Sequence, residues 1–257
     1  MTSAAVIAVA QADGGFHPFS PLHFGVLAGY ALVTTVLAAL GARWRGTPRA
    51  QPLHRAWTAF VILVQVTNII YWARPPNLAP QSSLPLHICD LAGIAAVLAL
   101  TTGPRLWRII LYYWGLGLST QAFITPVITE GPDTFRFHLF FASHLTIIAS
   151  AVYDLSARRF RPTWTDLRTI TLVLLAWGAI ILPLDIFTGW NYGYIGNTKP
   201  DQPTLIDRLG PWPLRLLWMF LFVEGAFALM TLAWWRPGKP TPIQSTPPAA
   251  APQHPVR

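Results

Sequence analysis

Seven apolar stretches follow one another along the chain, and they constrain the fold more than any other feature of the sequence. Each approaches the roughly 20 residues that a helix needs to cross a bilayer. They cover about residues 21–42, 56–73, 86–102, 106–125, 137–155, 167–187 and 213–235, and the third is the shortest. The sequence therefore predicts an all-α protein, a polytopic transmembrane bundle of about seven helices.

The composition supports a membrane protein and argues against several other classes. Charged residues make up 11% of the chain, whereas a soluble domain carries about 25%. The net charge of +8 is not a nucleic-acid signal, since no Lys/Arg run is interleaved with exposed aromatic residues. The single cysteine excludes an internal disulfide and a cysteine-rich metal site. The twelve tryptophans suit a protein with two membrane interfaces.

The two ends of the chain differ from the apolar centre. Residues 1–20 hold only a short apolar run, Ala4–Ala10, without the basic flank of a signal peptide, which predicts a flexible N-terminal tail. Residues 21–235 form the predicted transmembrane domain. Residues 236–257 are rich in Pro and Ala and lack periodicity, so we expect a disordered C-terminal tail.

The basic residues predict how the bundle sits in the membrane. Alternate connections 43–55, 103–108 and 156–168, with the C-terminal tail, hold thirteen of the eighteen Lys and Arg residues. Because cytoplasmic loops carry an excess of basic residues, these connections are predicted to be cytoplasmic. This topology puts the N-terminus outside and the C-terminus inside the cell.

Polar residues gather in the outer halves of the predicted helices, while inner halves such as 33–40 and 95–100 are nearly featureless. Polar groups inside a membrane are costly and are commonly functional. We therefore expect a polar cavity that opens to the outer leaflet or to the outside. The residues expected to form it are Asn68, Tyr71, His87, Cys89, Asp90, Gln121, His138, His144 and Glu224.

Cys89 and His144 are the pair with the most reactive potential. Cys89 lies about one turn into the third segment and His144 about two turns into the fifth, so both have a similar depth. A thiol becomes a useful nucleophile when a neighbouring base accepts its proton. His144 can supply that base, as can His138 or His87, and Asp90 could orient an imidazole.

A purely structural interpretation of the same residues stays open. A lone intramembrane cysteine is most often a small packed hydrophobe. A histidine on an apolar helix is more often an interhelical hydrogen-bond donor. Glu224 could pair with Arg215 or Arg136, and Gly115 and Gly117 are expected to allow close helix packing.

Four sequence blocks resemble a known family. They are LPLHICD at 84–90, YYWGLGLSTQAFITP at 112–126, FRFHLFFASH at 135–144, and NYGYIGNTKP with LIDRLGPWP at 191–213. Together they resemble the YwaF-like bacterial integral membrane proteins and, more distantly, the eukaryotic transmembrane protein 164 acyltransferases. The resemblance implies an acyl-enzyme dyad that moves a fatty acyl chain between phospholipids, with its cysteine at Cys89 and its histidine at His144. The block at 191–213 is expected to be an outer loop that covers the cavity.

The leading hypothesis is a membrane lipid acyltransferase or acyl hydrolase whose substrates are membrane phospholipids. Cys89 would attack an ester carbonyl, and His144 would act as general base and then as general acid. Asp90, Asn68 or Gln121 would orient the base or stabilise the oxyanion. No soluble cofactor is needed, and no HExxH motif or equivalent spacing indicates a metal.

The alternative is a non-enzymatic membrane protein, either a small-solute transporter or a lipid- or ligand-binding sensor. Asp90, Glu224 and the histidines would then relay protons or bind a cation. A transporter should carry polar groups through to the cytoplasmic side, and this sequence does not, which leaves a binding protein as the stronger form of the alternative.

Overall fold

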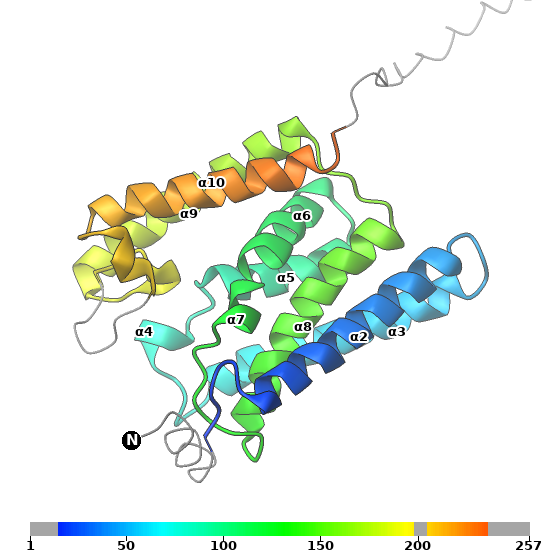
Figure 1. Cartoon of the computed structure of the whole chain (residues 1–257), viewed down its shortest axis with the longest axis horizontal. Helices are drawn as coiled ribbons and strands as arrows, with labels where there is room; N and C mark the ends of the chain where they lie inside the picture. Colours follow the sequence, from blue (N-terminus) through cyan, green and yellow to red (C-terminus); the bar gives the residue numbers. More distant parts are fainter. Residues whose placement is uncertain (1–14, 198–204, 236–257) are drawn as a thin grey trace, which may run out of the picture.

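The computed structural model describes residues 15–197 and 205–235, and every regular element within these ranges is helical (Figure 1). The elements are α2 (Pro21–Arg43), α3 (Ala50–Trp72), α4 (Pro80–Ser83), α5 (Ile88–Thr101), α6 (Arg105–Ile110), η1 (Leu111–Leu118), α7 (Gln121–Ile124), α8 (Phe135–Ser156), α9 (Trp164–Thr188), η2 (Tyr192–Tyr194), η3 (Leu205–Leu209) and α10 (Leu214–Leu232). The all-α prediction is confirmed for these ranges. The predicted C-terminal tail lies outside them, as does the predicted N-terminal tail up to residue 14.

Five of these helices, α2, α3, α8, α9 and α10, are long and apolar enough to cross a membrane, with mean hydropathies of 1.3 to 2.2. Large apolar side chains such as Leu32, Leu172 and Leu229 are about two-thirds exposed on their outer faces, as lipid-facing residues are. The chain is therefore a multi-pass membrane protein. The seven-span topology and the orientation of the termini stay predictions.

The third and fourth predicted segments are helical but differ from the other five. The third is α5, whose 14 residues span about 21 Å at 1.5 Å per residue, less than the roughly 30 Å of a bilayer core. The fourth is divided into α6, the π-helix η1 and α7. Helix α5 packs against α3 and α8, and α6 and η1 pack against α9 and α10, respectively, so longer helices on both sides accommodate the shorter elements.

The π-helix η1 is unusual because π-helices are rare and occur frequently at functional sites. Its wider turn continues to the backbone N–H of Ser119, which donates to the carbonyl oxygen of Trp114 at 2.8 Å. A Cβ on Gly115 would stand 2.9 Å from Ile147 of α8, and one on Gly117 would stand 2.9 Å from Met230 of α10. The expectation that these two glycines allow close helix packing is confirmed.

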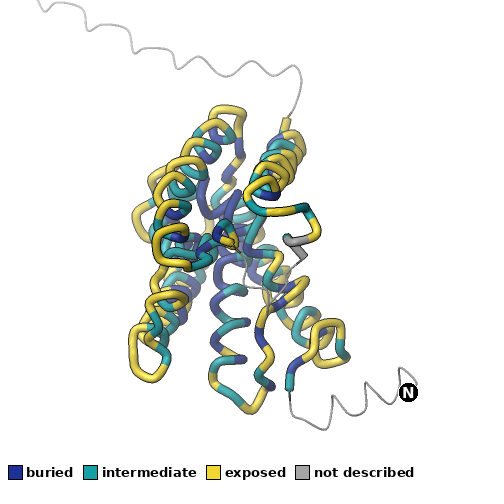
Figure 2. Tube along the Cα trace, turned by 90° about the vertical axis from the view of Figure 1, so that its left-hand side faces the viewer, coloured by how far each residue is buried: buried dark blue, intermediate teal, exposed yellow. Residues whose placement is uncertain are grey.

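Helix α8 lies at the centre of the bundle and packs against α2, α3, α5 and η1. Figure 2 shows the buried residues gathered in the interior and the exposed residues along the outer faces of the peripheral helices. Small and hydroxyl-bearing residues of α8, including Ala149, Ser150 and Ala151, are almost fully buried. They let the neighbouring helices approach closely, since small side chains are favoured at contacts between membrane helices.

Side-chain caps and one buried histidine fix the ends of the helices. Thr163 and Asp166 form a reciprocal capping box at the start of α9, which satisfies otherwise unpaired N–H groups. His23 of α2 is 1% exposed, and its Nε2 lies 2.7 Å from the carbonyl oxygen of Phe123. Phe16 is 2% exposed, so packing of the described chain begins before α2.

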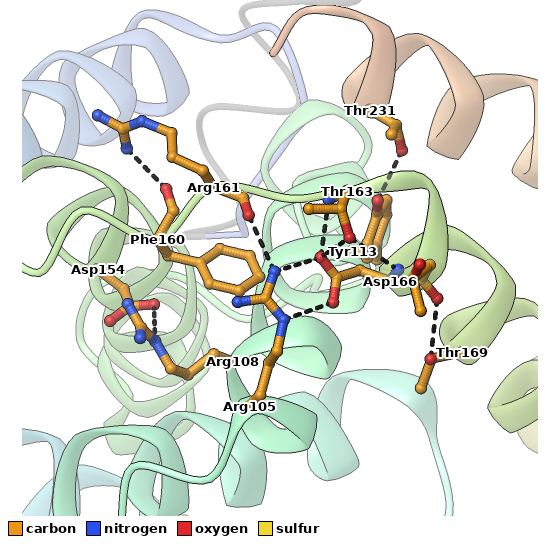
Figure 3. Close-up of polar contacts among 11 residues, drawn as sticks. Arg105, Arg108, Tyr113, Asp154, Phe160, Arg161, Thr163, Asp166, Thr169 and Thr231 are labelled. Atoms are coloured by element: carbon orange, nitrogen blue, oxygen red, sulfur yellow. Dashed lines mark hydrogen bonds and ion pairs between the residues drawn. The ribbon is translucent and has the colours of Figure 1, made fainter. Parts of the chain in front are cut away.

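Ion pairs join the helices at the basic end of the bundle (Figure 3). Arg105 of α6 donates to both carboxylate oxygens of Asp166 at 2.7 and 2.6 Å. Arg108 donates to Asp154 of α8 at 2.8 Å. The guanidinium carbons of both arginines lie over the buried ring of Phe160, at 5.2 and 5.0 Å from its centre. The two buried acids at this end are therefore both paired.

Candidate functional site

The loop that contains η2 is hydrogen-bonded to residues 80–87, which lead into α5. This loop and residues 80–87 are together called the clasp. The hydroxyl of Tyr192 accepts a hydrogen bond from the backbone N–H of Leu84 at 3.1 Å and donates to the carbonyl oxygen of Pro80. Trp177 of α9 donates from Nε1 to the carbonyl oxygen of Leu86 at 3.1 Å. Two of the four resembling blocks, separated by about a hundred residues, thus meet at the start of α5.

His87 belongs to this clasp. Its Nδ1 accepts a hydrogen bond from the backbone N–H of Gly193 at 3.3 Å, and its ring lies 4.7 Å from that of Tyr192. Because Nδ1 accepts, the neutral ring carries its hydrogen on Nε2. His87 precedes α5, and burial lowers its pKa to about 4. His87 is therefore neutral at pH 7 with its free nitrogen lone pair already engaged, which suits a structural role better than that of a base.

Asp90 lies in the first turn of α5. Its carboxylate interacts with the backbone N–H of His87, the residue that precedes the helix. A carboxylate at this position satisfies one of the free N–H groups of the first turn and complements the helix dipole. The observed contact of Asp90 is thus with the backbone and not with an imidazole.

Cys89 is half-buried between α5, the end of η1 and the η2 loop. Its thiol interacts with the hydroxyl of Ser119, and it also interacts electrostatically with Tyr194. The π-helix positions Ser119, whose hydroxyl donates to the carbonyl oxygen of Trp114 at 3.1 Å. Ser119, which was not among the predicted site residues, is therefore a hydroxyl-bearing contact of the thiol, and Tyr194 lies within electrostatic range of it.

His144 of α8 is held in one tautomer. Its Nδ1 lies 2.8 Å from the carbonyl oxygen of Phe140, and a carbonyl oxygen can only accept, so Nδ1 carries the hydrogen. The ring packs at 4.5 Å from that of Phe140 and at 6.4 Å from that of Phe123. Nε2 has no hydrogen-bond partner within the described ranges. It keeps a lone pair, as a general base requires.

Contacts on both sides of Ser119 fix how η1 and α7 run along α8. Gly115 packs on Ile147, and the ring of Phe123 stacks on that of Phe141 at 6.1 Å. As residue numbers rise from 115 to 123, the contacted residues of α8 fall from 147 to 141, so the two segments are antiparallel. Ser119 lies midway in sequence between Gly115 and Phe123, the two residues that contact α8.

His144 lies midway along α8 between the two residues that η1 and α7 contact, so it has the depth of Ser119. Helical side chains lean toward the N-terminus of their helix, and the bond of His144 Nδ1 to Phe140 agrees with that direction. Cys89, which interacts with Ser119, therefore has a depth similar to that of His144. No hydrogen bond joins Cys89 to His144 in the ranges that the structure describes.

Gln65 is a buried polar residue that the sequence analysis missed. It is 5% exposed, and its amide donates to the carbonyl oxygen of Ser143 at 3.1 Å and to the hydroxyl of Thr146 at 2.9 Å. Its Oε1 lies where a Cβ on Gly93 would stand. Gln65 thus connects α3, α5 and α8 one turn below Cys89. A glutamine inside the apolar run VILVQV was the available signal.

Three of the other predicted cavity residues, His138, Tyr71 and Asn68, lie in the first turn of α8 or the last turns of α3. His138 bonds through Nε2 to the carbonyl oxygen of Pro132 at 2.7 Å and is exposed. Tyr71 accepts at its backbone oxygen from Asn77 at 3.2 Å, and Asn68 is half-buried on α3. Neither the His138 contact nor the Tyr71 contact involves Cys89.

Gln121 and Glu224 make local contacts. Gln121 is exposed and donates to Thr125. Glu224 of α10 accepts a hydrogen bond from the hydroxyl of Thr171 of α9 at 2.7 Å, while its other carboxyl oxygen is buried without a hydrogen-bond partner. Its observed partner is thus a threonine. Within the described ranges, no three His, Cys, Asp or Glu residues gather closely enough to hold a metal ion.

Comparison with known proteins agrees with the membrane architecture. The TMEM164 family model matches residues 18–231 of the 257-residue chain. No curated protein and no solved structure matches it. The match includes the clasp before α5, the π-helix, the central helix and the η2 loop, and with more than half of its length covered, the chain belongs to the TMEM164 family.

Proposed function

We propose that the protein transfers or hydrolyses a fatty acyl chain of a membrane phospholipid, with Cys89 as nucleophile and His144 as base. The observation that carries the proposal is the tautomer of His144. Its Nδ1–H is engaged by Phe140, which leaves a proton-accepting Nε2 at the depth of the Cys89 thiol. A histidine that served only as an interhelical donor would direct its N–H to another helix, and His144 bonds within its own.

The reaction follows from these two groups. As Cys89 Sγ attacks the ester carbonyl, His144 Nε2 takes the thiol proton and then delivers it to the departing lysophospholipid oxygen. The products of this half-reaction are a Cys89 thioester and a lysophospholipid. In the second half, an alcohol of another lysophospholipid, or water, loses its proton to His144 and attacks the thioester, which restores the thiol.

Two neighbours of the thiol suit the charge that develops on the carbonyl oxygen. The thiol interacts with the Ser119 hydroxyl, whose hydrogen would turn from the carbonyl oxygen of Trp114 to the oxyanion, and Tyr194 interacts electrostatically with Cys89. Hydroxyl donors aimed at an oxyanion stabilise the tetrahedral intermediate. They replace Asp90, Asn68 and Gln121, which the sequence analysis had assigned to this task. An apolar surround and a thiol inside the bilayer suit a substrate that never leaves the membrane.

The test uses the full-length protein in phosphatidylcholine nanodiscs that contain a radiolabelled diacyl phospholipid and a lysophospholipid acceptor. Cys89→Ala should abolish formation of labelled product and of hydroxylamine-sensitive protein labelling. His144→Gln should lower the rate about 10²- to 10⁴-fold, the usual contribution of a general base. His138→Gln, an exposed histidine change in the same helix, should keep activity within about two-fold of the wild type. Full lipid remodelling by Cys89→Ala would refute the proposal.

A further inference from the structure

An open cavity of about 400 Å³ lies at the basic end of the bundle, between the ends of α2, α3, α5 and α8. It is separate from the Cys89 region, because it adjoins Leu100 at the far end of α5. Eleven residues along a helix correspond to roughly 17 Å. The wall of the cavity includes Arg45, Gln51, His54 and Arg158, and we call it the basic cavity.

The positive charge of the arginines in the basic cavity is only partly neutralised by acidic side chains. Arg45 donates to the carbonyl oxygens of Ala157 and Ser156, at the end of α8. Arg158 donates to the carbonyl oxygen of Ala99 and lies 3.2 Å from Asp154. Carbonyl oxygens carry only partial charge, so these contacts orient the guanidinium groups without neutralising them.

Asp154 cannot balance both arginines near it. It is already the ion-pair partner of Arg108, which donates to its other carboxylate oxygen at 2.8 Å (Figure 3). No acidic side chain belongs to the residues that line the cavity in the described structure. Arg108 and Arg158 thus share the carboxylate of Asp154, while in the described part of the chain Arg45 bonds only to carbonyl oxygens, so the three arginines keep a net charge of about +2.

The start of helix α3 also suits an anion. It begins at Ala50 without a side-chain cap or an acidic residue in its first turn, so the positive end of its dipole faces the same region, although the N–H of Ala50 is bonded to Thr47 and Pro52 has no N–H. His54 bonds through Nε2 to the carbonyl oxygen of Leu100 at 3.1 Å, which leaves its Nδ1 as a buried acceptor without a hydrogen-bond partner.

We propose that the basic cavity binds a phosphate ester, supplied by the headgroup of an anionic lipid or by a soluble molecule. Arginine recognises phosphate oxygens through its fixed fork of N–H donors, and the positive dipole end of α3 favours the same anion. The site is independent of the acyl-transfer chemistry proposed for Cys89.

Gln51 offers a way to test the charge of the cavity without removing a structural arginine. It is exposed and lies in the first turn of α3, where a glutamate is favourable for the helix. Gln51→Glu should therefore fold and should weaken anion binding about ten-fold by placing a like charge beside the ligand. Gln51→Lys should bind at least as tightly as the wild type. The matched control is Gln81→Glu in the first turn of α4, which follows the opposite end of α3. This variant should bind the anion as tightly as the wild type.

Binding is measured as the ligand-dependent rise in unfolding temperature of the full-length protein in dodecyl maltoside. One arm adds phosphatidylglycerol, with phosphatidylcholine as the neutral comparison, and the other adds glycerol 1-phosphate. A rise with phosphatidylglycerol alone assigns a lipid headgroup, and a rise with glycerol 1-phosphate as well assigns a soluble phosphate ester. The proposal is overturned if neither probe stabilises the protein, or if Gln51→Glu and Gln81→Glu weaken binding equally.

Discussion

Gly193 packs directly against the indole ring of Trp177, so closely that a Cβ on the glycine would stand 2.1 Å from a ring carbon. The same indole donates from Nε1 to the carbonyl oxygen of Leu86. Trp177 therefore joins α9, the η2 loop and the segment before α5 at one point. The backbone of Gly193 has φ of 63°, a region that other residues adopt only with strain.

Gly193→Ala should lower both thermal stability and lipid remodelling, since the added methyl group must displace Trp177 from the clasp. Gly189→Ala separates this clash from backbone strain, because Gly189 has φ of 71° but open space around its Cβ position. We expect Gly189→Ala to cost about 1 kcal/mol and Gly193→Ala to cost clearly more. The measurement is the unfolding temperature of both variants in the same detergent. Equal losses would show that the contact with Trp177 contributes nothing.

Acid should loosen the clasp through His87. Its pKa is about 4 in the folded protein, because of burial, against 6.5 for the exposed side chain. The unfolded state therefore binds more protons between pH 6.5 and pH 4, so stability is complete above this window and falls as the pH falls through it. The largest loss is roughly 3 kcal/mol at pH 4. Tyr192 and Tyr194 face the ring and stay uncharged in this range.

The variant His87→Gln gives the comparison for the acid effect. A glutamine oxygen can still accept from Gly193 but does not titrate between pH 4 and pH 6.5. The difference in unfolding free energy between the wild type and His87→Gln should therefore change with pH in that window and level off above it. A difference that is constant with pH would mean that His87 is not the titrating group.

The apolar segments predicted the helices well because length and hydropathy are local properties of the chain. The π-helical turn of η1 could not be predicted in the same way, since its hydrogen bonds depend on how Gly115 and Gly117 pack against α8 and α10. The turn decides that Ser119, and not the neighbouring Gln121, contacts Cys89. Which polar residue of a segment faces a site is thus set by packing and not by sequence order.

Depth along the helices could be predicted for Cys89 and His144, but their partners could not. The sequence predicts His87 as an alternative base for the thiol and Asp90 as a group that orients an imidazole. The structure instead gives His87 a bond to Gly193 and gives Asp90 a contact with the helix backbone. These partners come from a loop about a hundred residues away and from the start of α5 itself, and neither leaves a periodic signal in the sequence.

Asp154→Asn should be among the most destabilising single changes at the basic end. Asp154 is 2% exposed, and it pairs with Arg108 at 2.8 Å and with Arg158 at 3.2 Å. Removing a buried carboxylate leaves its cations uncompensated, which costs about 3–5 kcal/mol for a fully buried pair and less here, since both arginines are partly exposed. Glu130→Gln breaks the exposed pair with Arg136 and should cost below about 1 kcal/mol. Chemical unfolding of both variants checks this order.

Gln65 and Gly93 should show strong coupling in a double-mutant cycle. Gly93→Ala places a methyl group 2.3 Å from Oε1 of Gln65, so the side chain must move and lose its bonds to Ser143 and Thr146. Gln65→Ala loses the same bonds, while the Thr146 hydroxyl keeps its bond to the carbonyl oxygen of Ser143, so each lost bond costs about 0.5–1.5 kcal/mol.

The double variant Gln65→Ala/Gly93→Ala should be no less stable than Gln65→Ala alone, because the shortened side chain leaves room for the new methyl group. The coupling energy, about 1–3 kcal/mol in favour of the double variant, is measured from urea unfolding in mixed micelles. Gly25→Ala serves as the control, since a Cβ there meets nothing within 4 Å and its effect should add to that of Gln65→Ala. Additive effects of Gly93→Ala and Gln65→Ala would show that the glutamine side chain does not occupy the space next to Gly93. Gln65 would then not connect α3, α5 and α8 near Cys89.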